Sequence, residues 1–387
     1  MKTRVPDYFK KFKCIASECE DTCCAGWEIV IDDDTYDIYK TVDGEFGKRL
    51  KEEIYLDEEN DPIFRLKGNN CAFLNDNKMC DIYSELGENA LCYTCQQYPR
   101  YTEEFGSIRE VGLSLSCPEA CRIILGTSKI TEFETSEDDG MVPAYNDISF
   151  DIFMQLTKAR KVMIKIIQDR SIELNYRIAI VLSFSEEIQK KIDEDKIEEI
   201  KYICEKYCNR EFLDEYIDNL DKYKNNHEHK YINMKKYFMV YKSLDHINEE
   251  WTKILDDVTK YLFGKEMNCE IYVDKYKEFD SYYVDNFYEY EHLMVYFIFR
   301  YFMKSVFDYD VSAKVKMAVV SYLMIKELGI YRWSKNNGIF TKKDQEEVMR
   351  MYSKDIEHSD ENMESLYETF ESAEAFKEEE LLIMLMS

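Results

Sequence analysis

The stretch FDIFMQLTKARKVMIKIIQ, residues 150–168, spaces its apolar side chains three and four positions apart. This spacing places them on one face of a helix, which can then pack against a core. The same pattern recurs in YRIAIVLSFSEEIQKKI (176–192) and in VKMAVVSYLMIKEL (315–328). Only three of the twelve glycines lie beyond residue 140, which favours long helices over strands and turns. We therefore predict that the C-terminal two-thirds of the chain is almost wholly helical.

The first 121 residues are different, because they contain ten of the thirteen cysteines. Short apolar stretches such as WEIVI, PIFRL and CAFL are separated there by Asp, Asn and Gly, which predicts a few short strands among loops and helical turns. Such loops bury little apolar area, so a metal or cluster would supply part of the stabilisation. We predict a mainly α protein: a small, irregular, Cys-rich metal- or cluster-binding module at 1–128, an acidic linker at 129–148 and a larger all-helical domain at 149–387.

Nine cysteines of the module are candidate metal ligands, because thiolates two to four residues apart can converge on one centre. Nine ligands are more than one tetrahedral zinc ion needs. Either two centres exist, or one cluster uses four thiols while the others support it, and spacing does not decide between zinc and iron. All five histidines lie far along the chain, so we expect an all-thiolate centre. The candidate ligands are Cys14, Cys19, Cys23, Cys24, Cys71, Cys80, Cys92, Cys95 and Cys117.

The charge balance narrows the class of partner. With 78 acidic and 51 basic residues the formal net charge is -27, which repels phosphate backbones, so we expect no nucleic-acid partner. The most apolar stretch, 293–307, is shorter than a bilayer span and is interrupted by Arg300 and Lys304, which favours a buried helix over a membrane segment. The opening residues MKTRVPDYFKKFKC show no secretory signal, so we expect a soluble, cytoplasmic protein without disulfides.

Several common catalytic motifs are absent from the chain. It has no G-x-G-x-x-G after a strand, no P-loop, no G-x-S-x-G and no HExxH. These absences argue against a nucleotide-binding protein, a hydrolase or a metalloprotease of the usual kinds.

Three cysteine-bearing blocks carry a family resemblance. They are CIASECEDTCCAGWEIVID (14–32), CAFLNDNKMCDIYSELGENALCYTCQQYPR (71–100) and LSLSCPEACRIIL (113–125). Together with the opening PDYFKKFKC, they resemble the signature blocks of the bacterial flagellin lysine-N-methylase family. The first half also resembles small proteins with a CxxCxxCC signature that are described as zinc- or iron-chelating. EYEHLMVYFIFRYFMKSVFD (289–308) is similar to the family's helical C-terminal block, more loosely.

This resemblance implies methyl transfer from S-adenosylmethionine to lysine ε-amines of flagellin, by an enzyme with an iron-sulfur cluster on these cysteines. A 4Fe-4S cluster is expected, with zinc as the alternative. Tyr98 and Arg100 are the expected cofactor-binding residues, orienting the carboxylate of the methyl donor or the backbone of the substrate, with a structural role in packing the metal region as the alternative. Glu88, Glu110 or Glu119 could accept the lysine's proton. No glycine-rich strand-loop-helix for the donor is visible, so the donor would bind in another way.

Two other classes of function remain open on the residues alone. One is a non-catalytic zinc- or iron-binding protein that acts as a scaffold or chaperone, and the other is a redox cluster protein. Neither of them would transfer methyl groups.

Overall fold

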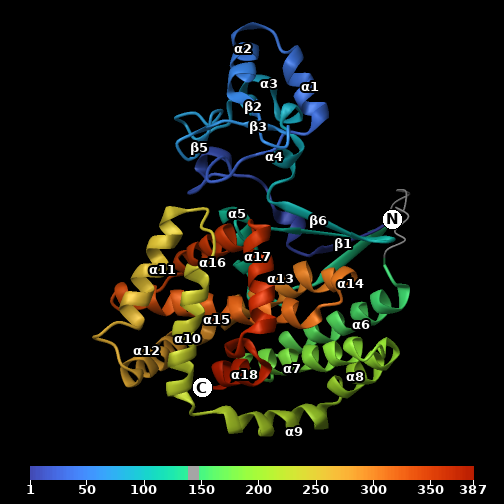
Figure 1. Ribbon diagram of the computed structural model, residues 1–387, viewed down its shortest axis with the longest axis vertical. Coiled ribbons are helices and arrows are strands. Elements are labelled where there is room, and N and C mark those ends of the chain that lie inside the picture. The colour runs from blue at the N-terminus through green and yellow to red at the C-terminus, as the bar shows by residue number, and fades with distance from the viewer. Residues whose placement is uncertain (138–147) are drawn as a thin grey trace.

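The computed structural model describes residues 1–137 and 148–387 (Figure 1). A mainly α fold with a large helical domain is confirmed. Part of the predicted acidic linker, residues 138–147, lies outside the described residues. Another part of it, Phe133–Glu137, forms strand β8.

The helical domain is built around α15 (Val311–Lys335), which is buried along nearly all of its length. It packs against α7, α13, α16 and α17. The stretch 293–307 lies mainly in α13 and is buried, so the predicted buried helix is confirmed. Within the residues that the structure describes, no helix is both long enough and apolar enough to cross a membrane. The other helices of the domain are α6 (Phe150–Ile167), α7 (Leu174–Asp193), α8 (Ile200–Tyr207), α9 (Arg210–Leu220), α10 (His227–Lys242), α11 (Glu249–Leu262), α12 (Cys269–Tyr283), α13 (Phe287–Tyr301), α14 (Ser305–Asp308), α16 (Lys342–Ile356), α17 (Asp360–Ser372) and α18 (Glu378–Met386).

A four-stranded sheet packs against these helices. Its order is β6-β7-β1-β8, in which β1 is parallel to β7 and the other neighbours are antiparallel. The buried Glu110 of β7 binds Arg4 of β1 at 3.0 Å and Arg160 of α6, so an ion pair connects the sheet to the helical domain. The strands are β1 (Lys2–Pro6), β6 (Arg100–Phe105), β7 (Ile108–Leu113) and β8.

Residues 14–97, here called the cysteine lobe, lie in sequence between β1 and β6. They have a small hydrophobic core of their own, which includes Ile31, Leu50, Phe64 and Phe73. Figure 1 shows this lobe at one end of the molecule, beyond the sheet. Its elements are α1 (Asp33–Thr41), α2 (Gly44–Glu53), β2 (Ile54–Leu56), β3 (Pro62–Phe64), β4 (Leu66–Lys67), β5 (Asn70–Cys71), α3 (Asp81–Leu86) and α4 (Tyr93–Gln97).

Helix α5 (Pro118–Leu125) follows β7 after the short link 114–117. The link emerges from the sheet where the cysteine lobe meets the helical domain, and its last residue is Cys117. It therefore presents a thiol from outside the lobe to the thiols inside it.

Candidate active site

The nine predicted ligand cysteines gather in two groups. The first group, here called the interface thiols, consists of Cys14, Cys19, Cys23 and Cys117. Burial, and then the neighbouring thiols of Cys19 and Cys14, raise the pKa of Cys117 to about 11. Contact with Cys24 and then burial raise the pKa of Cys23, and Cys14 and Cys117 act on it in the same direction. These mutual effects link the four thiols electrostatically.

The second group, here called the lobe thiols, lies in and around the core of the cysteine lobe. Burial, and then the thiols of Cys24, Cys80 and Cys92, raise the pKa of Cys71 to about 12. Contact with Cys95 lowers the pKa of Cys92, which is fully buried. The adjacent Cys23 and Cys24 interact directly, so this pair connects the two groups. The lobe thiols are Cys24, Cys71, Cys80, Cys92 and Cys95.

The chemistry of these donors fits a soft metal or an iron-sulfur cluster. Several thiols in each group interact electrostatically, and the pKa values of Cys71 and Cys117 are raised in part by the negative charge of neighbouring thiolates. A bound cation would remove that repulsion. Among residues 1–137 and 148–387, however, no three His, Cys, Asp or Glu side chains are close enough together to bind a single metal ion.

The loop that carries the interface thiols is held on the helical domain by ion pairs. Asp21 binds both Arg350 and Lys354 of α16, with Lys354 at 3.2 Å. Although burial opposes it, these two cations hold the pKa of Asp21 below its usual value. Gly26 allows the close approach, because its φ is +88° and a Cβ there would lie 3.4 Å from Lys354 Cε. Glu20 binds Arg122 of α5 at 3.1 Å.

Three rings lie together beside the interface thiols. The ring centres of Trp27 and Tyr98 are 6.0 Å apart, those of Trp27 and His358 are 6.2 Å apart, and those of Tyr98 and His358 are 6.3 Å apart. Trp27 and Tyr98 are partly exposed and His358 is exposed. Trp27 is hydrogen-bonded to the backbone of Cys23 and Tyr98 to Ser116, which precedes Cys117, so the rings lie beside the segments that carry these two thiols.

Hydrogen bonds fix the orientation of each ring. Trp27 Nε1 donates to the carbonyl oxygen of Cys23 at 2.8 Å. Ser116 Oγ lies 3.1 Å from Tyr98 Oη and 2.8 Å from His358 Nε2, so one hydroxyl connects two of the rings. Loss of water around the imidazole, and then the positive charge of Arg300, lower the pKa of His358 to about 4. The imidazole is therefore neutral at physiological pH.

A buried ion pair holds the turn that carries His358. Arg300 of α13 lies 3.0 Å from the Glu357 carboxylate, and their side chains are only 12% and 0% exposed. Tyr296 and Tyr301 also donate to this carboxylate, at 2.8 and 2.6 Å. The pair fixes the turn between α16 and α17, and His358 follows Glu357 directly in that turn.

The structure sorts the other predicted site residues. Tyr98 lies in the site, whereas Arg100 begins β6 and its guanidinium stacks over the Phe12 ring at 5.1 Å. Glu110 is buried against Arg160 and Glu119 binds Arg122, so both carboxylates already have cationic partners. Glu88 lies in a short helical turn of the cysteine lobe.

Sequence reasoning did not give a role to four residues of this site: Ser116, Arg300, Glu357 and His358. The expectation of an all-thiolate centre stays a prediction, although one histidine, His358, lies against Ser116 despite its distance along the chain. Only Trp27 carried a usable signal, because it follows the paired cysteines by a few residues.

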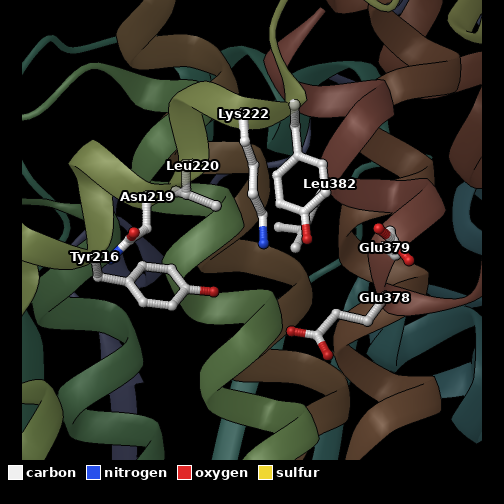
Figure 2. Close-up of a pocket in the computed structure, with 8 residues that line it drawn as sticks. Tyr216, Asn219, Leu220, Lys222, Glu378, Glu379 and Leu382 are labelled. Atoms are coloured by element: carbon white, nitrogen blue, oxygen red, sulfur yellow. The ribbon is translucent and has the colours of Figure 1, made fainter.

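A hollow in the described part of the molecule lies away from this site. It has a volume of about 430 Å³ and lies between α9 and α18, as Figure 2 shows. No cysteine lines it, so it is separate from the thiol chemistry. The lining residues are Tyr216, Asn219, Leu220, Lys222, Tyr223, Glu378, Glu379 and Leu382.

The helical domain, which contributes part of the site, matches a known protein family. Residues 160–384, which include Arg300, Glu357 and His358, match the family described as the FliB lysine N-methylase C-terminal domain. The chain belongs to the FliB lysine N-methylase family.

Two curated relatives of this FliB-family protein are similar over short stretches. The lysine-N-methylase of Salmonella typhimurium is 30% identical over 126 residues, which are 31% of each chain. The flagellar biosynthetic protein FliU of Salmonella muenchen is 31% identical over 126 residues, which are 31% of this chain and 75% of FliU. The match thus spans about a third of the length of the lysine-N-methylase relative. No solved structure matches the chain.

Proposed function

We propose that this protein is an S-adenosylmethionine-dependent protein-lysine N-methyltransferase that acts on flagellin and carries an iron-sulfur cluster on its N-terminal cysteines. One observation carries the proposal: His358 of the FliB-family helical domain is hydrogen-bonded to Ser116, the residue that precedes Cys117 in the link. The domain that is named for lysine methylation and the thiol-rich region thus contribute to the same site.

The interface thiols are the proposed ligands of the reactive cluster, because they lie at the partly exposed junction of the lobe and the helical domain. Cys14 and Cys23 are exposed, whereas Cys71 and Cys92 are buried inside the cysteine lobe. We assign the lobe thiols to a structural role or to a second centre. An iron-sulfur cluster, when bound, supplies a site for the amino and carboxylate groups of S-adenosylmethionine.

The residues of the chain position the lysine. A lysine must be neutral to attack the methyl group, so it has to lose a proton before the transfer. The imidazole of His358, with its pKa lowered to about 4, is too weak a base to take that proton, but its exposed edge can contact the incoming side chain. Ser116 holds the ring in place, which keeps that edge beside the interface thiols.

Anaerobically purified protein tests the proposal. Iron, zinc and acid-labile sulfide are measured per chain, and flagellin is then weighed by mass spectrometry after incubation with S-adenosylmethionine. We expect iron with sulfide, and flagellin peptides whose lysines gain mass in steps of one methyl group. Flagellin of unchanged mass under reducing conditions, with a fully loaded protein, would refute methyl transfer.

A matched pair of serine variants tests the ligand assignment. Cys117→Ser should lose iron and activity together, whereas Cys208→Ser should keep both, because Cys208 is exposed at the end of α8 in the helical domain. Equal iron contents in the two variants would remove Cys117 from the ligand set. Zinc without sulfide would favour the non-catalytic metal-binding alternative.

A further inference from the structure

We propose that the rings of Trp27, Tyr98 and His358 form the receptor for the substrate's lysine side chain. This inference rests on the proposed function and assigns the residues that recognise its substrate. The three ring centres form a nearly equilateral triangle with sides of 6.0, 6.2 and 6.3 Å. The planes of the three ring pairs are tilted against each other by 42°, 52° and 44°, so the rings do not form a parallel stack.

This geometry suits a cation on a slender stem. The ring faces of Trp and Tyr carry negative charge and attract an ammonium group within about 6 Å of the ring centre. A point close above a triangle of this size lies within that range of the centres of Trp27 and Tyr98, and His358 forms the third side. An adenine ring could stack on one of these faces, so binding of the methyl donor is the alternative that the test has to separate.

The charges around the rings are mixed. Two cations, Arg300 from α13 and Lys354 from α16, act against a further positive charge at His358. Each has a carboxylate partner that reduces this effect, although Lys354 shares its partner Asp21 with Arg350. Arg300 is 3.0 Å from Glu357, and Lys354 is 3.2 Å from Asp21. The protein as a whole carries a formal net charge of -27, which attracts basic segments of a partner over longer distances.

The receptor is assembled from both halves of the protein. Trp27 and Tyr98 belong to the cysteine lobe and its exit, whereas His358 belongs to the helical domain. Ser116 connects Tyr98 to His358, and Cys23 orients Trp27 through its carbonyl oxygen. A lysine held over the triangle would therefore lie beside Cys23 and Cys117, where the proposed function places the methyl donor.

Binding of a lysine peptide to the full, iron-loaded chain tests the inference without any methyl transfer. The probe is a short peptide with one lysine, and the matched control peptide replaces that lysine with norleucine, which has a similar stem and no amine. The chain reports its own binding, because Trp251 and Trp333 are 1% and 9% exposed while Trp27 is partly exposed. Quenching or shift of tryptophan emission thus reads mainly Trp27, and calorimetry confirms the affinity.

We expect the lysine peptide to bind more tightly than the norleucine peptide, and Tyr98→Leu to weaken it roughly fivefold. Tyr98→Phe keeps the ring and should retain most of the affinity. Tyr93→Leu is the control for removing a nearby tyrosine, since Tyr93 is 61% exposed and lies outside the triangle, and it should have no effect. Trp27→Phe changes a second ring of the triangle but keeps an aromatic side chain against the core of the cysteine lobe. Calorimetry measures the affinity of this variant for the lysine peptide.

The outcomes separate this inference from the proposed function. Equal affinity for both peptides, or an unchanged affinity in Tyr98→Leu with normal iron content and circular dichroism, would overturn the receptor. Loss of S-adenosylmethionine binding in Tyr98→Leu, with lysine binding intact, would also overturn it and assign the rings to the donor. Ring-dependent lysine binding without methylation of flagellin would leave the receptor standing and refute the proposed reaction.

Discussion

Replacing Glu357 with Gln should strongly destabilise the protein. The change removes the negative charge 3.0 Å from Arg300, in a pair whose side chains are 12% and 0% exposed. Breaking a buried pair costs about 3–5 kcal/mol because the remaining charge stays buried without compensation. The glutamine oxygen can still accept a bond from Tyr296 or Tyr301, so we expect a value at the lower end, about 3 kcal/mol.

Urea unfolding of the full chain, followed by circular dichroism, measures this loss as a lower midpoint at an unchanged slope. Glu371→Gln on α17 is the matched control, because Glu371 is exposed and its replacement should change the free energy of unfolding by less than about 0.5 kcal/mol. Arg300→Met combined with Glu357→Gln should cost less than the sum of the two single changes. A loss below about 1 kcal/mol in Glu357→Gln, typical of a solvated pair, would refute the reasoning.

Three further changes have measurable outcomes. Burial raises the pKa of Glu289 from 4.5 to about 7. As the pH rises, the carboxyl therefore loses its proton in the unfolded chain before it does so in the folded one. The free energy of unfolding falls between these two pH values. Glu289→Gln should then be about as stable as the parent at pH 4 and up to about 3 kcal/mol more stable at pH 8, in unfolding titrations at both values. Gly112→Ala should lower stability by about 1–3 kcal/mol in a thermal melt, because its Cβ would lie 2.2 Å from Tyr101 Oη. A preserved melting temperature would show that the Tyr101 ring moves aside. Removing iron with a chelator should make residues 14–97 sensitive to trypsin while the helical domain stays intact on a gel; equal resistance with and without iron would argue against metal-dependent order in the cysteine lobe.

The helices could be predicted because their signal is local. The apolar period in 150–168 corresponds to α6, Phe150–Ile167, almost residue for residue. The sheet could not be predicted in the same way, since it pairs Lys2 with Ile108 and with Glu137. No periodicity along the chain encodes such distant partners. The stretch WEIVI, which looked strand-like, forms only an isolated bridge between Val30 and Ile63.

The candidate site, too, could be predicted from the sequence only in part. The thiols were visible because cysteines are rare and their spacing is local. His358 and Ser116 are 242 positions apart, and neither has a sequence neighbour that suggests the contact. Arg300 looked like an interruption of an apolar stretch, whereas its guanidinium lies 4.6 Å from the Tyr101 ring centre and pairs with Glu357. A single charge in an apolar helix does not reveal which buried partner will compensate for it.

The cysteine lobe is inserted between β1 and β6, so it could be removed as one segment, here called the cassette. The sheet and the helical domain that would remain are called the frame. Both strands flank β7, and Pro6 and Arg100 lie at the same end of the sheet, where the chain leaves and returns. Two strand spacings separate these points, about 10 Å, a gap that a short glycine linker can bridge. The frame of sheet and helices would keep Cys117, while the excised cassette would keep Cys14, Cys19 and Cys23. The interface thiols are complete only in the joined protein, so the metal content of that centre would report whether cassette and frame are correctly assembled.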